Sequence, residues 1–397
     1  MTLLRVGVDA RPLCAPYTGV SNYTLNLLRA LLVHQPSIDF YGYHSYRWNL
    51  LDEAFLHHRS AAGAEARPAG VSPVAAGLQS LKGLPLIRGA ARLMQGMAYS
   101  VRPGGRGLAL FHAFQYVAPR QSTLPTIPVV YDLSFLRHPA WHPVSRLLAL
   151  LPLAEQCRDA PVVHTISAFS AAEIQSLLGV DRRRIHIIPP GVGSAFLADR
   201  PPQPTTLAAF DLRADGFFLA VGTLEPRKNL RTLIQAYARL PLSLRRRWPL
   251  CVAGPAGWGD MDLPPEAAGL VELGMLRFLG YLAIDDLRDL YGAARLVLYP
   301  SLYEGFGMPV IEAMACGAPV LCSDAAAIPE AGGSLATYVS PLDVDAWTQA
   351  LMQVVDSSAS KDRDLRERRR AHALGFRWSL GAERAVGLYQ AALEGLG

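Results

Sequence analysis

Short apolar strands alternate with helical segments along most of the 397-residue chain, and this alternation restricts the fold more than any other feature. Near the start, Leu4–Val8 is a β-branched apolar run. A loop with proline and glycine follows at 11–19, and leucines at helical spacing indicate a helix over 21–32. A strand, a loop and a helix in this order form half of a βαβ unit. The sequence therefore predicts an α/β fold with a mainly parallel sheet and helices on both faces.

The alternation is interrupted and then repeated, which indicates two domains. The segment DRPPQPT at 199–205 has the composition of an interdomain linker. We predict two doubly wound domains that face a central cleft, because such sheets bind ligands at the carboxyl ends of their strands. The predicted boundaries are a first domain over 1–198, a linker over 199–212, a second domain over 213–375 and a C-terminal helix over 376–397 that crosses back to the first domain. Further strands are predicted at 108–112, 126–131, 162–166, 185–188, 217–221, 250–253, 277–279, 296–299 and 320–322, and further helices at 230–240, 284–292 and 310–316.

Membrane spans, disulfides and zinc sites are disfavoured. The densest apolar run, Leu147–Ala154, is too short to cross a bilayer and contains Pro152. The five cysteines are odd in number and scattered, and they include no Cys-x-x-Cys pair. The start, MTLLRVGVDARP, lacks the apolar core and cleavage site of a signal peptide, so we expect a cytoplasmic protein.

Positive charge is concentrated in the first half. Residues 1–200 carry a net charge of +8, and residues 201–397 carry −3. No acidic residue lies between Glu65 and Asp132, and the segment 74–101 is weakly amphipathic. This pattern favours peripheral contact with an anionic membrane, on the inner face of the cytoplasmic membrane, with a solvated loop as the alternative. Nucleic acid is disfavoured as a partner, because no aromatic-interleaved basic motif or zinc-finger spacing accompanies the charge. The basic residues of the acid-free stretch are Arg67, Lys82, Arg88, Arg92, Arg102, Arg106 and Arg120.

The common nucleotide-binding and hydrolase motifs are missing, so the candidate functional residues are sought in two loops that follow predicted strands. The sequence has no Gly-x-Gly-x-x-Gly after a strand, no P-loop and no Gly-x-Ser-x-Gly. The first loop, GTLEPRKN at 222–229, places Arg227 and Lys228 beside the free N–H groups of a helix start, with Asn229 as the expected N-cap. Lys228 is one of only three lysines among 38 basic residues. This loop is suited to a diphosphate; the alternative is a solvated helix start.

The second loop, YPSLYEGFGMPVIEAMACG at 299–317, carries two carboxylates at one helix start. Pro309 is suited to the first helical position, so Glu312 falls in the first turn, and Glu304 precedes the helix on a loop with two glycines. Two acids there either complement the helix dipole or shape a pocket for a hydroxyl-rich ligand. The glycines and Phe306 between the acids favour the pocket.

Five elements in this order resemble the retaining, nucleotide-sugar-dependent glycosyltransferase family 4, which has the GT-B fold. The similarity runs from residue 5 to about 390. The elements are TGVSNY at 18–23, SAFS at 167–170 before IIPPGV at 187–192, the Arg-Lys-Asn loop at 227–229, the Glu-x7-Glu pair at 304 and 312, and FRW to Tyr at 376–389.

The resemblance implies a role for each site residue. Glu312 would hold the ribose hydroxyls of the donor nucleotide, and Glu304 would contact the hydroxyls of the donor sugar. Arg227 and Lys228 would hold the diphosphate leaving group, and Gly19 would let the amino-terminal loop approach it. Members of this fold need no metal or cofactor, so the resemblance implies that neither is required here. The implied catalytic residues are Glu304, Arg227, Lys228 and Asp132, and the implied donor-binding residues are Gly19, Gly222, Arg227, Lys228, Glu304, Gly305, Phe306, Gly307, Met308 and Glu312.

One position departs from the family pattern. Many relatives have histidine where this chain has Tyr131, beside the reacting carbon of the sugar. Tyrosine donates one hydrogen bond but is a poor cation near neutral pH. Either Asp132 with a main-chain carbonyl suffices, or another residue such as His112 or His138 contributes.

The resulting hypothesis is a metal-independent, retaining hexosyltransferase. It would move a hexose from a nucleotide-diphosphate sugar to a glycan or lipid-diphosphate-linked acceptor in the biosynthesis of a surface polysaccharide such as lipopolysaccharide. The segment YDLSFLRHP at 131–139 is more similar to bacterial mannosyl- and rhamnosyltransferases, which favours a GDP-hexose. The alternatives are a GT-B-fold sugar-nucleotide epimerase and a nucleotide-sugar-binding protein without transfer activity.

Overall fold

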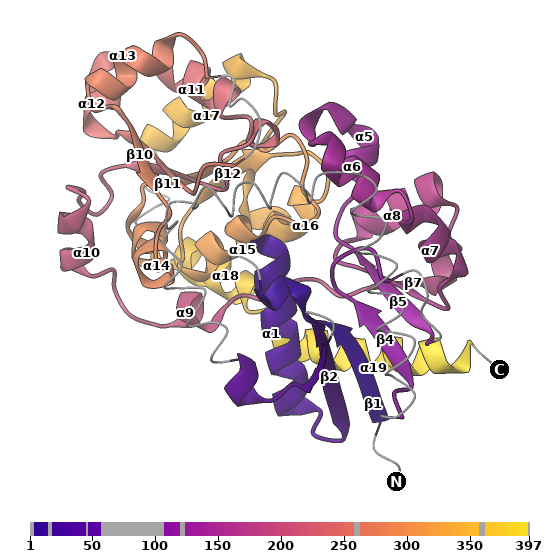
Figure 1. The fold of residues 1–397 in the computed structure, drawn as a ribbon. Coiled ribbons are helices and arrows are strands. Elements are labelled where there is room, and N and C mark those ends of the chain that lie inside the picture. The colour runs from indigo at the N-terminus through magenta and orange to yellow at the C-terminus, as the bar shows by residue number, and fades with distance from the viewer. Residues whose placement is uncertain are drawn as a thin grey trace, which may run out of the picture. The chain divides into compact units, whose positions relative to one another are not determined.

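The chain forms two compact units in the computed structural model, which describes residues 4–14, 18–44, 47–56, 107–119, 124–257, 263–356 and 362–395 (Figure 1). Unit 1 comprises Met1–Leu133, Val144–Pro190 and Trp378–Gly397. Unit 2 comprises Ser134–Pro143 and Gly191–Arg377.

Unit 1 is built on a seven-stranded sheet with the order β3-β2-β1-β4-β5-β6-β7. All neighbouring strands are parallel except β2 and β3, which pair as an antiparallel edge. The strand order reverses between β1 and β4, so a crevice is expected there at the carboxyl ends of the strands. The strands are β1 (Leu4–Asp9), β2 (Ile38–His44), β3 (Arg47–Leu50), β4 (Leu110–Ala113), β5 (Thr126–Val130), β6 (Val163–Thr165) and β7 (Ile185–Ile187).

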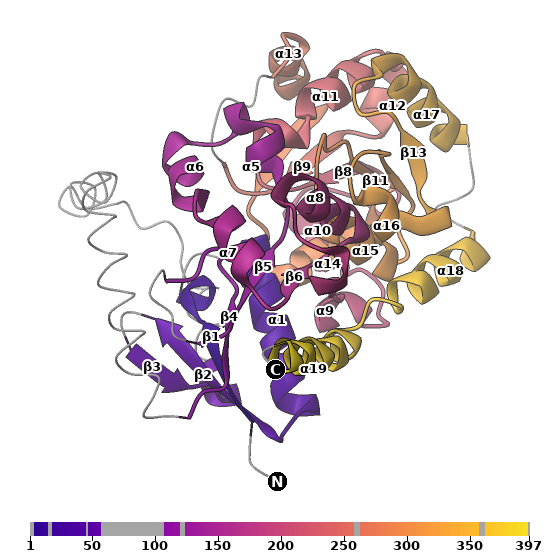
Figure 2. The same ribbon diagram turned by 90° about the vertical axis from the view of Figure 1, so that its right-hand side faces the viewer.

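The first and last helices of unit 1 pack against each other (Figures 1 and 2). Helix α1 (Gly19–His34) begins after Thr18, whose side chain accepts a hydrogen bond from the Ser21 amide and so caps the helix. Helix α19 (Trp378–Glu394) places Gly381 against Leu27 of α1, and a Cβ at Gly381 would lie 3.3 Å from the Leu27 side chain. The other helices of this unit are η1 (Arg11–Cys14), α6 (Val144–Leu150), α7 (Leu153–Asp159), α8 (Ala168–Leu178) and η4 (Arg182–Arg184).

Unit 2 has a six-stranded, fully parallel sheet with the order β10-β9-β8-β11-β12-β13. This is the order of a dinucleotide-binding sheet, with its switch point between β8 and β11. The strands are β8 (Phe218–Val221), β9 (Leu250–Ala253), β10 (Leu276–Gly280), β11 (Leu296–Tyr299), β12 (Val320–Ser323) and β13 (Thr337–Val339).

Helices cover both faces of the unit 2 sheet (Figures 1 and 2). One face carries α11 (Leu230–Ala238), α12 (Leu242–Arg247), α13 (Glu266–Glu272) and α17 (Val344–Asp356). The other carries α14 (Ile284–Ala293), α15 (Met308–Ala315), α16 (Ile328–Gly332) and α18 (Arg363–Ala373). The remaining helices of unit 2 are α5 (Ser134–Arg137), η3 (Pro139–Trp141), α9 (Ser194–Leu197), α10 (Pro204–Ala209), η5 (Pro226–Lys228) and η6 (Gly333–Leu335).

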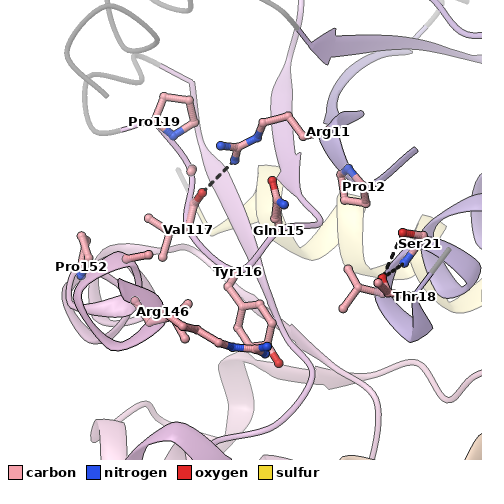
Figure 3. Close-up of a pocket in the computed structure, with 14 residues that line it drawn as sticks. Arg11, Pro12, Thr18, Ser21, Gln115, Tyr116, Val117, Pro119, Arg146 and Pro152 are labelled. Atoms are coloured by element: carbon pink, nitrogen blue, oxygen red, sulfur yellow. Dashed lines mark hydrogen bonds between the residues drawn. The ribbon is translucent and has the colours of Figure 1, made fainter. Parts of the chain in front are cut away.

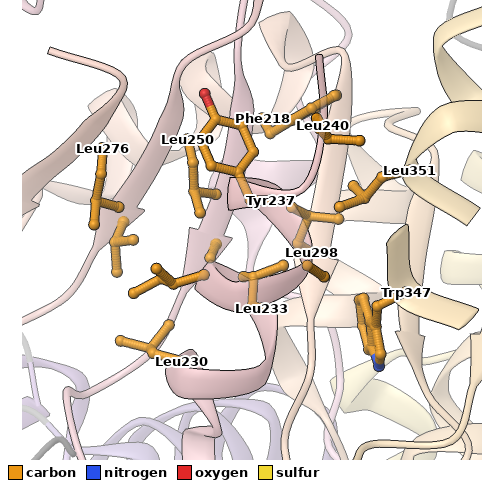
Figure 4. Packing of buried hydrophobic residues seen from close by; sticks show 14 of the residues in the cluster. Phe218, Leu230, Leu233, Tyr237, Leu240, Leu250, Leu276, Leu298, Trp347 and Leu351 are labelled. Carbon is orange, nitrogen blue, oxygen red and sulfur yellow. The ribbon is translucent and has the colours of Figure 1, made fainter. Parts of the chain in front are cut away.

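An apolar core between the sheet, α11 and α17 holds unit 2 together (Figure 4). Phe218 and Leu298 from the strands meet Leu233 and Tyr237 of α11, and Trp347 of α17 is fully buried beside them. Burying a large apolar side chain stabilises a fold by about 1.5–3 kcal/mol. This core fixes the strands whose ends carry the loops at 222–229 and 300–308.

The predicted α/β architecture with two doubly wound sheets is confirmed, and the boundaries differ in detail. The segment 199–212, predicted as a linker, belongs to unit 2 and contains α10, while Trp378–Gly397 belongs to unit 1. Strands β2, β3 and β13 were not predicted. The amphipathic segment 74–101 and the seven basic residues of the acid-free stretch lie outside the described residues. Among the described helices, none is long and apolar enough to cross a membrane.

Candidate functional site

Two loops meet at the switch point of the unit 2 sheet. The loop after β8 and the loop after β11 are joined by a hydrogen bond from the Leu302 amide to the Arg227 carbonyl, 2.8 Å long. Asn229 adds a side-chain clamp, because its amide donates to the carbonyls of Pro300 (3.0 Å) and Pro341 (2.6 Å). Asn229 occupies the N-cap position of α11, as expected, but its backbone is left-handed and its side chain makes no capping hydrogen bond. Asn229 instead fixes one loop on the other.

Glu304 lies between the two predicted cations. Its Oε2 accepts a hydrogen bond from Arg227 Nη1 at 2.5 Å, and its Oε1 accepts one from Lys228 Nζ at 2.5 Å. The carboxylate is 6% exposed. Burial opposes its ionisation, but Arg227 and Lys228 outweigh this and lower the pKa of Glu304 to about 2. Glu304 is therefore ionised at neutral pH.

The two cations are held by further contacts. Lys228 Nζ donates to the Tyr299 hydroxyl at 3.1 Å and lies 5.1 Å from the centre of its ring. Arg227 Nη1 donates to the Tyr303 carbonyl at 3.1 Å. Burial lowers the pKa of Lys228, which Glu304 partly opposes. The positive charges are thus preorganised at the end of the sheet.

Glu225, in the same loop, was not identified from the sequence. Its side chain is 1% exposed, and Arg227 Nε lies 2.5 Å from its Oε1. Burial raises the pKa of Glu225 despite this neighbour. The sequence feature that could have identified Glu225 is its position two residues before Arg227, the predicted phosphate-binding arginine.

Glu312 lies on α15 and is buried. The Tyr291 hydroxyl donates to its Oε2 at 3.4 Å. Burial raises the pKa of Glu312 to about 7, only partly opposed by that hydrogen bond. Helix α15 begins at Met308, one residue before Pro309, and its first turn contains no acidic residue. The prediction that Glu312 falls in the first turn was therefore wrong.

Two of the predicted glycines, Gly307 and Gly222, occupy positions that require glycine or a close approach. Gly307 has φ of +115° immediately before α15. Gly222 follows β8, and a Cβ there would lie 3.1 Å from Lys228 Cε. Gly305 and the buried Phe306 directly precede Gly307 in the loop after β11. The Phe306 ring packs edge-on against Phe376.

The remaining predicted site residues, Gly19 and Asp132, belong to unit 1. Gly19 is the first residue of α1, and nothing lies within 4 Å of where its Cβ would be. Tyr131 is buried and its hydroxyl donates to the Phe114 carbonyl at 2.9 Å. Its hydroxyl therefore has a structural partner within unit 1.

The two histidines considered as substitutes for Tyr131 lie in different units. His112 is fully buried in unit 1, bonded to His164 at 2.9 Å and to the Tyr389 hydroxyl at 3.1 Å, which is a structural role. His138 is in unit 2, where it stacks on Trp141 with centroids 3.9 Å apart and meets the edge of Tyr303.

Unit 1 has a pocket of its own at the switch point between β1 and β4, with a volume of about 490 Å³ (Figure 3). Arg11 enters it after β1, held by Asp9 at 2.6 Å and by the Val117 carbonyl at 3.1 Å. Tyr116 lines it with φ of +61°, a conformation uncommon for tyrosine. The sequence did not indicate this pocket. Its other lining residues are Pro12, Thr18, Val20, Ser21, Gln115, Val117, Ala118, Pro119, Arg146, Ala149, Leu150 and Pro152.

No group of three or more histidine, cysteine, aspartate or glutamate side chains that could hold a metal ion occurs within the described part of the chain.

The chain is similar to known proteins in sequence and in fold. The family model described as glycosyl transferases group 1 matches residues 211–372, which contain the unit 2 site. The O-antigen chain mannosyltransferase B of Escherichia coli is 30% identical over 392 residues, covering 98% of this chain and 100% of the relative. Sucrose-phosphate synthase from Thermosynechococcus elongatus has a TM-score of 0.68 at 20% identity, covering 98% of both chains. HepE from Anabaena, solved with UDP and glucose, has a TM-score of 0.65 at 16% identity, covering 97% of this chain and 98% of that one. With the sequence relationship extending over nearly the whole chain and the GT-B fold shared, this protein belongs to the glycosyltransferase group 1 family.

Proposed function

We propose that this glycosyltransferase moves a hexose, with retention of the anomeric configuration, from a nucleotide-diphosphate sugar to a glycan or lipid-diphosphate-linked acceptor of a surface polysaccharide. The observation that carries the proposal is the cluster of Arg227, Lys228 and Glu304 at the switch point of the unit 2 sheet. Two half-buried cations and one ionised carboxylate match a donor with a diphosphate next to a polyhydroxylated ring.

The donor's charge would be held by Arg227 and Lys228. As the bond between the sugar and the diphosphate breaks, negative charge develops on the leaving oxygen, and fixed cations stabilise it without reorganisation. Glu304 would accept hydrogen bonds from sugar hydroxyls, and Glu312 from the ribose hydroxyls. The acceptor hydroxyl would then attack from the face that the diphosphate leaves, which retains the configuration. Because two cationic side chains face the proposed position of the leaving group, we propose that no metal ion is required.

The donor is proposed to be a GDP-hexose such as GDP-mannose. The support is the similarity over 98% of the chain to the E. coli O-antigen mannosyltransferase. HepE, solved with UDP and glucose, resembles this chain in fold alone, so it does not distinguish the donor base.

The acceptor is proposed to enter the unit 1 pocket. Arg11 and Arg146 supply positive charge there, Gln115 and Ser21 supply hydrogen-bonding groups, and the remaining lining is mostly apolar. This combination suits a sugar ring with an adjacent phosphate. Peripheral contact with an anionic membrane is proposed from the basic first half of the sequence.

Thermal-shift measurements with GDP, UDP, ADP and TDP test the donor, because a ligand raises the unfolding temperature according to its affinity. Transfer from the matching nucleotide sugar to a lipid-linked acceptor, followed by NMR of the new linkage, tests the reaction and its stereochemistry. We expect stabilisation by GDP, transfer with retention and full activity in EDTA. Release of an altered free sugar without an acceptor would indicate the epimerase instead, and a requirement for added Mg²⁺ or Mn²⁺ would contradict metal independence.

Replacing the leaving-group cation should slow the reaction. Lys228→Ala is expected to lower kcat by about 10²- to 10³-fold, the usual effect of removing one preorganised stabiliser of developing charge. Arg246→Ala, on the exposed face of α12, is the matched control and should leave kcat unchanged. Equal kcat for wild type and Lys228→Ala would contradict the assigned role.

A further inference from the structure

Two carboxylates share the two cations of the unit 2 site, but unequally. Glu304 accepts a hydrogen bond from each cation, both at 2.5 Å. Glu225 has an ion pair with Arg227 alone, through Nε at 2.5 Å. Neither of its oxygens is aligned to accept a hydrogen bond from a described residue, although the side chain is 1% exposed. Glu225 is therefore the less stabilised of the two anions.

The charges of this cluster balance only while no donor is present. Arg227 and Lys228 oppose Glu225 and Glu304. A nucleotide-diphosphate sugar brings two further negative charges, one on each phosphate. Four negative charges would then face two positive ones in a buried site, and a like charge disfavours the ionised form of a carboxyl group. Something in the cluster has to lose negative charge.

We infer that Glu225 takes up a proton from the solvent when a nucleotide-diphosphate sugar binds, so that Arg227 turns from a counter-ion of Glu225 into a counter-ion of the diphosphate. The step is a simple protonation of the carboxylate to the carboxylic acid, with the proton supplied by water or buffer. The inference rests on the proposed function, because it presupposes a diphosphate at Arg227 and Lys228. It makes Glu225 a positioning residue that acts through Arg227.

The proton is assigned to Glu225 because of its neighbours. The charged groups that face it are Arg227, Lys228 and Glu304, of which only Arg227 is within ion-pairing distance. Glu304 has two direct cationic partners, which lower its pKa to about 2. Burial raises the pKa of Glu225, which brings it closer to the neutral range where uptake is measurable.

Glu312 titrates in the same range with the opposite sign. Its pKa in the free protein is about 7, and it must be ionised to accept the ribose hydroxyls, so donor binding releases a proton there. The net number of protons that the wild type takes up is therefore the uptake by Glu225 minus the release by Glu312. Substituting each glutamate in turn separates the two contributions.

Isothermal titration calorimetry with GDP-mannose, in buffers of different ionisation enthalpy, counts the protons exchanged on binding. The intact nucleotide sugar is the probe, because its phosphates do not titrate near neutral pH as the terminal phosphate of GDP does. At pH 7 the wild type should take up more protons than Glu225→Gln, by up to one per bound ligand. Glutamine keeps the size of the side chain and imitates the protonated acid. Glu272→Gln, exposed at the end of α13, is the matched control and should behave as wild type.

The affinity should follow the same pattern. The pH slope of wild-type affinity for GDP-mannose, less the slope of Glu225→Gln, should be a fall of up to tenfold per pH unit between the pKa of Glu225 in the free protein and its higher pKa in the complex. Glu312→Gln, which lacks the opposing contribution, should show this fall by itself. If Glu225→Gln does not fold, the Glu312→Gln variant provides the test. It should take up protons when GDP-mannose binds, and no uptake would overturn the inference. Equal proton counts and equal pH slopes for wild type and Glu225→Gln would overturn the inference while leaving the donor site intact. Failure of both GDP-mannose and UDP-glucose to bind the wild type would overturn the proposed function itself.

Discussion

At the scale of single residues, the site depends on charges that are buried together. Glu304, Arg227 and Lys228 are all largely removed from water, and each has its partner within 2.5 Å. Removing one member of a buried ion pair costs about 3–5 kcal/mol, because the remaining charge is left uncompensated. A change at Glu304 therefore affects both catalysis and stability.

Glu304→Ala should abolish transfer and also lower the free energy of unfolding. The substitution leaves Arg227 and Lys228 without their shared carboxylate, so we expect a loss of about 3–5 kcal/mol in urea denaturation. Glu304→Gln keeps two hydrogen-bonding atoms, so its free energy of unfolding should be higher than that of Glu304→Ala. It should still lose most transfer activity. Near-wild-type turnover in either variant would show that the sugar does not depend on this carboxylate.

The sequence indicated the individual charges but not their pairing. Arg227, Lys228 and Glu304 could be predicted because their residue types and their places at strand ends are unusual for structural roles. Glu225 and the clamp of Asn229 could not, since both depend on which loops the sheet brings together. Contacts across about 70 residues of sequence, such as Asn229 to Pro300, follow from strand order, which no local pattern specifies.

At the scale of elements, the site loop after β8 rests on the loop after β9. Gly254 follows β9 with φ of +150°, and a Cβ there would overlap the carbonyl of Gly222. A Cβ at Gly257 would lie 2.6 Å from the Leu224 carbonyl oxygen. Both neighbours are backbone atoms, which cannot rotate away. These two glycines let the loop after β8 pack directly against the loop after β9, and this packing positions Arg227 and Lys228.

Gly254→Ala is expected to weaken donor binding and to destabilise the protein by about 1–3 kcal/mol, through backbone strain and displacement of the β8 loop. Gly269→Ala is the control: it lies inside α13 with nothing within 4 Å of its Cβ, and should stabilise by about 0.5–1 kcal/mol. Urea denaturation and nucleotide titration measure the two effects. If Gly254→Ala and Gly269→Ala have the same free energy of unfolding and the same nucleotide affinity, the loops after β8 and β9 are not in contact.

Elements with a strong local pattern were predictable. Strands such as β8, β9 and β11 are short apolar runs bounded by turns, and the predicted positions agree with the structure to within a residue. Strand β2 was missed because its sequence IDFYGYH contains glycine and polar residues, and β13 because it has only three residues. Both are held by pairing with their neighbours and not by their own composition.

At the scale of the whole molecule, the two units contain buried groups that titrate in opposite directions. In unit 1, His164 Nε2 bonds the Tyr23 hydroxyl at 2.8 Å, which itself donates to the Ile188 carbonyl. His164 therefore donates to Tyr23 and accepts at Nδ1 from His112, so each ring carries a single proton. Protonating either ring breaks the chain inside the core. In unit 2, Glu312 is the corresponding buried group, and it is more stable protonated.

The sign of each effect follows from the shifted pKa. Burial lowers the pKa of His164 to about 3 and that of His112 well below its usual value. The stability that these histidines contribute is present above about pH 6.5 and is lost as the pH falls toward 3, at up to about 1.4 kcal/mol per pH unit for each. Burial raises the pKa of Glu312 to about 7, so its contribution is present below about pH 4.5 and is lost as the pH rises to 7.

Acidification from pH 7.5 to 5 should therefore weaken unit 1 relative to unit 2. Hydrogen exchange followed by mass spectrometry, corrected for the intrinsic pH dependence of exchange, reports the opening free energy of each unit separately. We expect protection of β4, β6 and α19 to fall on acidification while protection of β8 and β11 holds or rises. His164→Asn should flatten the pH dependence in unit 1 alone, and Glu312→Gln should flatten it in unit 2 alone, whatever their effects on stability at a fixed pH. Parallel pH profiles for the two units, unchanged in both variants, would mean that these buried groups do not set the pH response of the molecule.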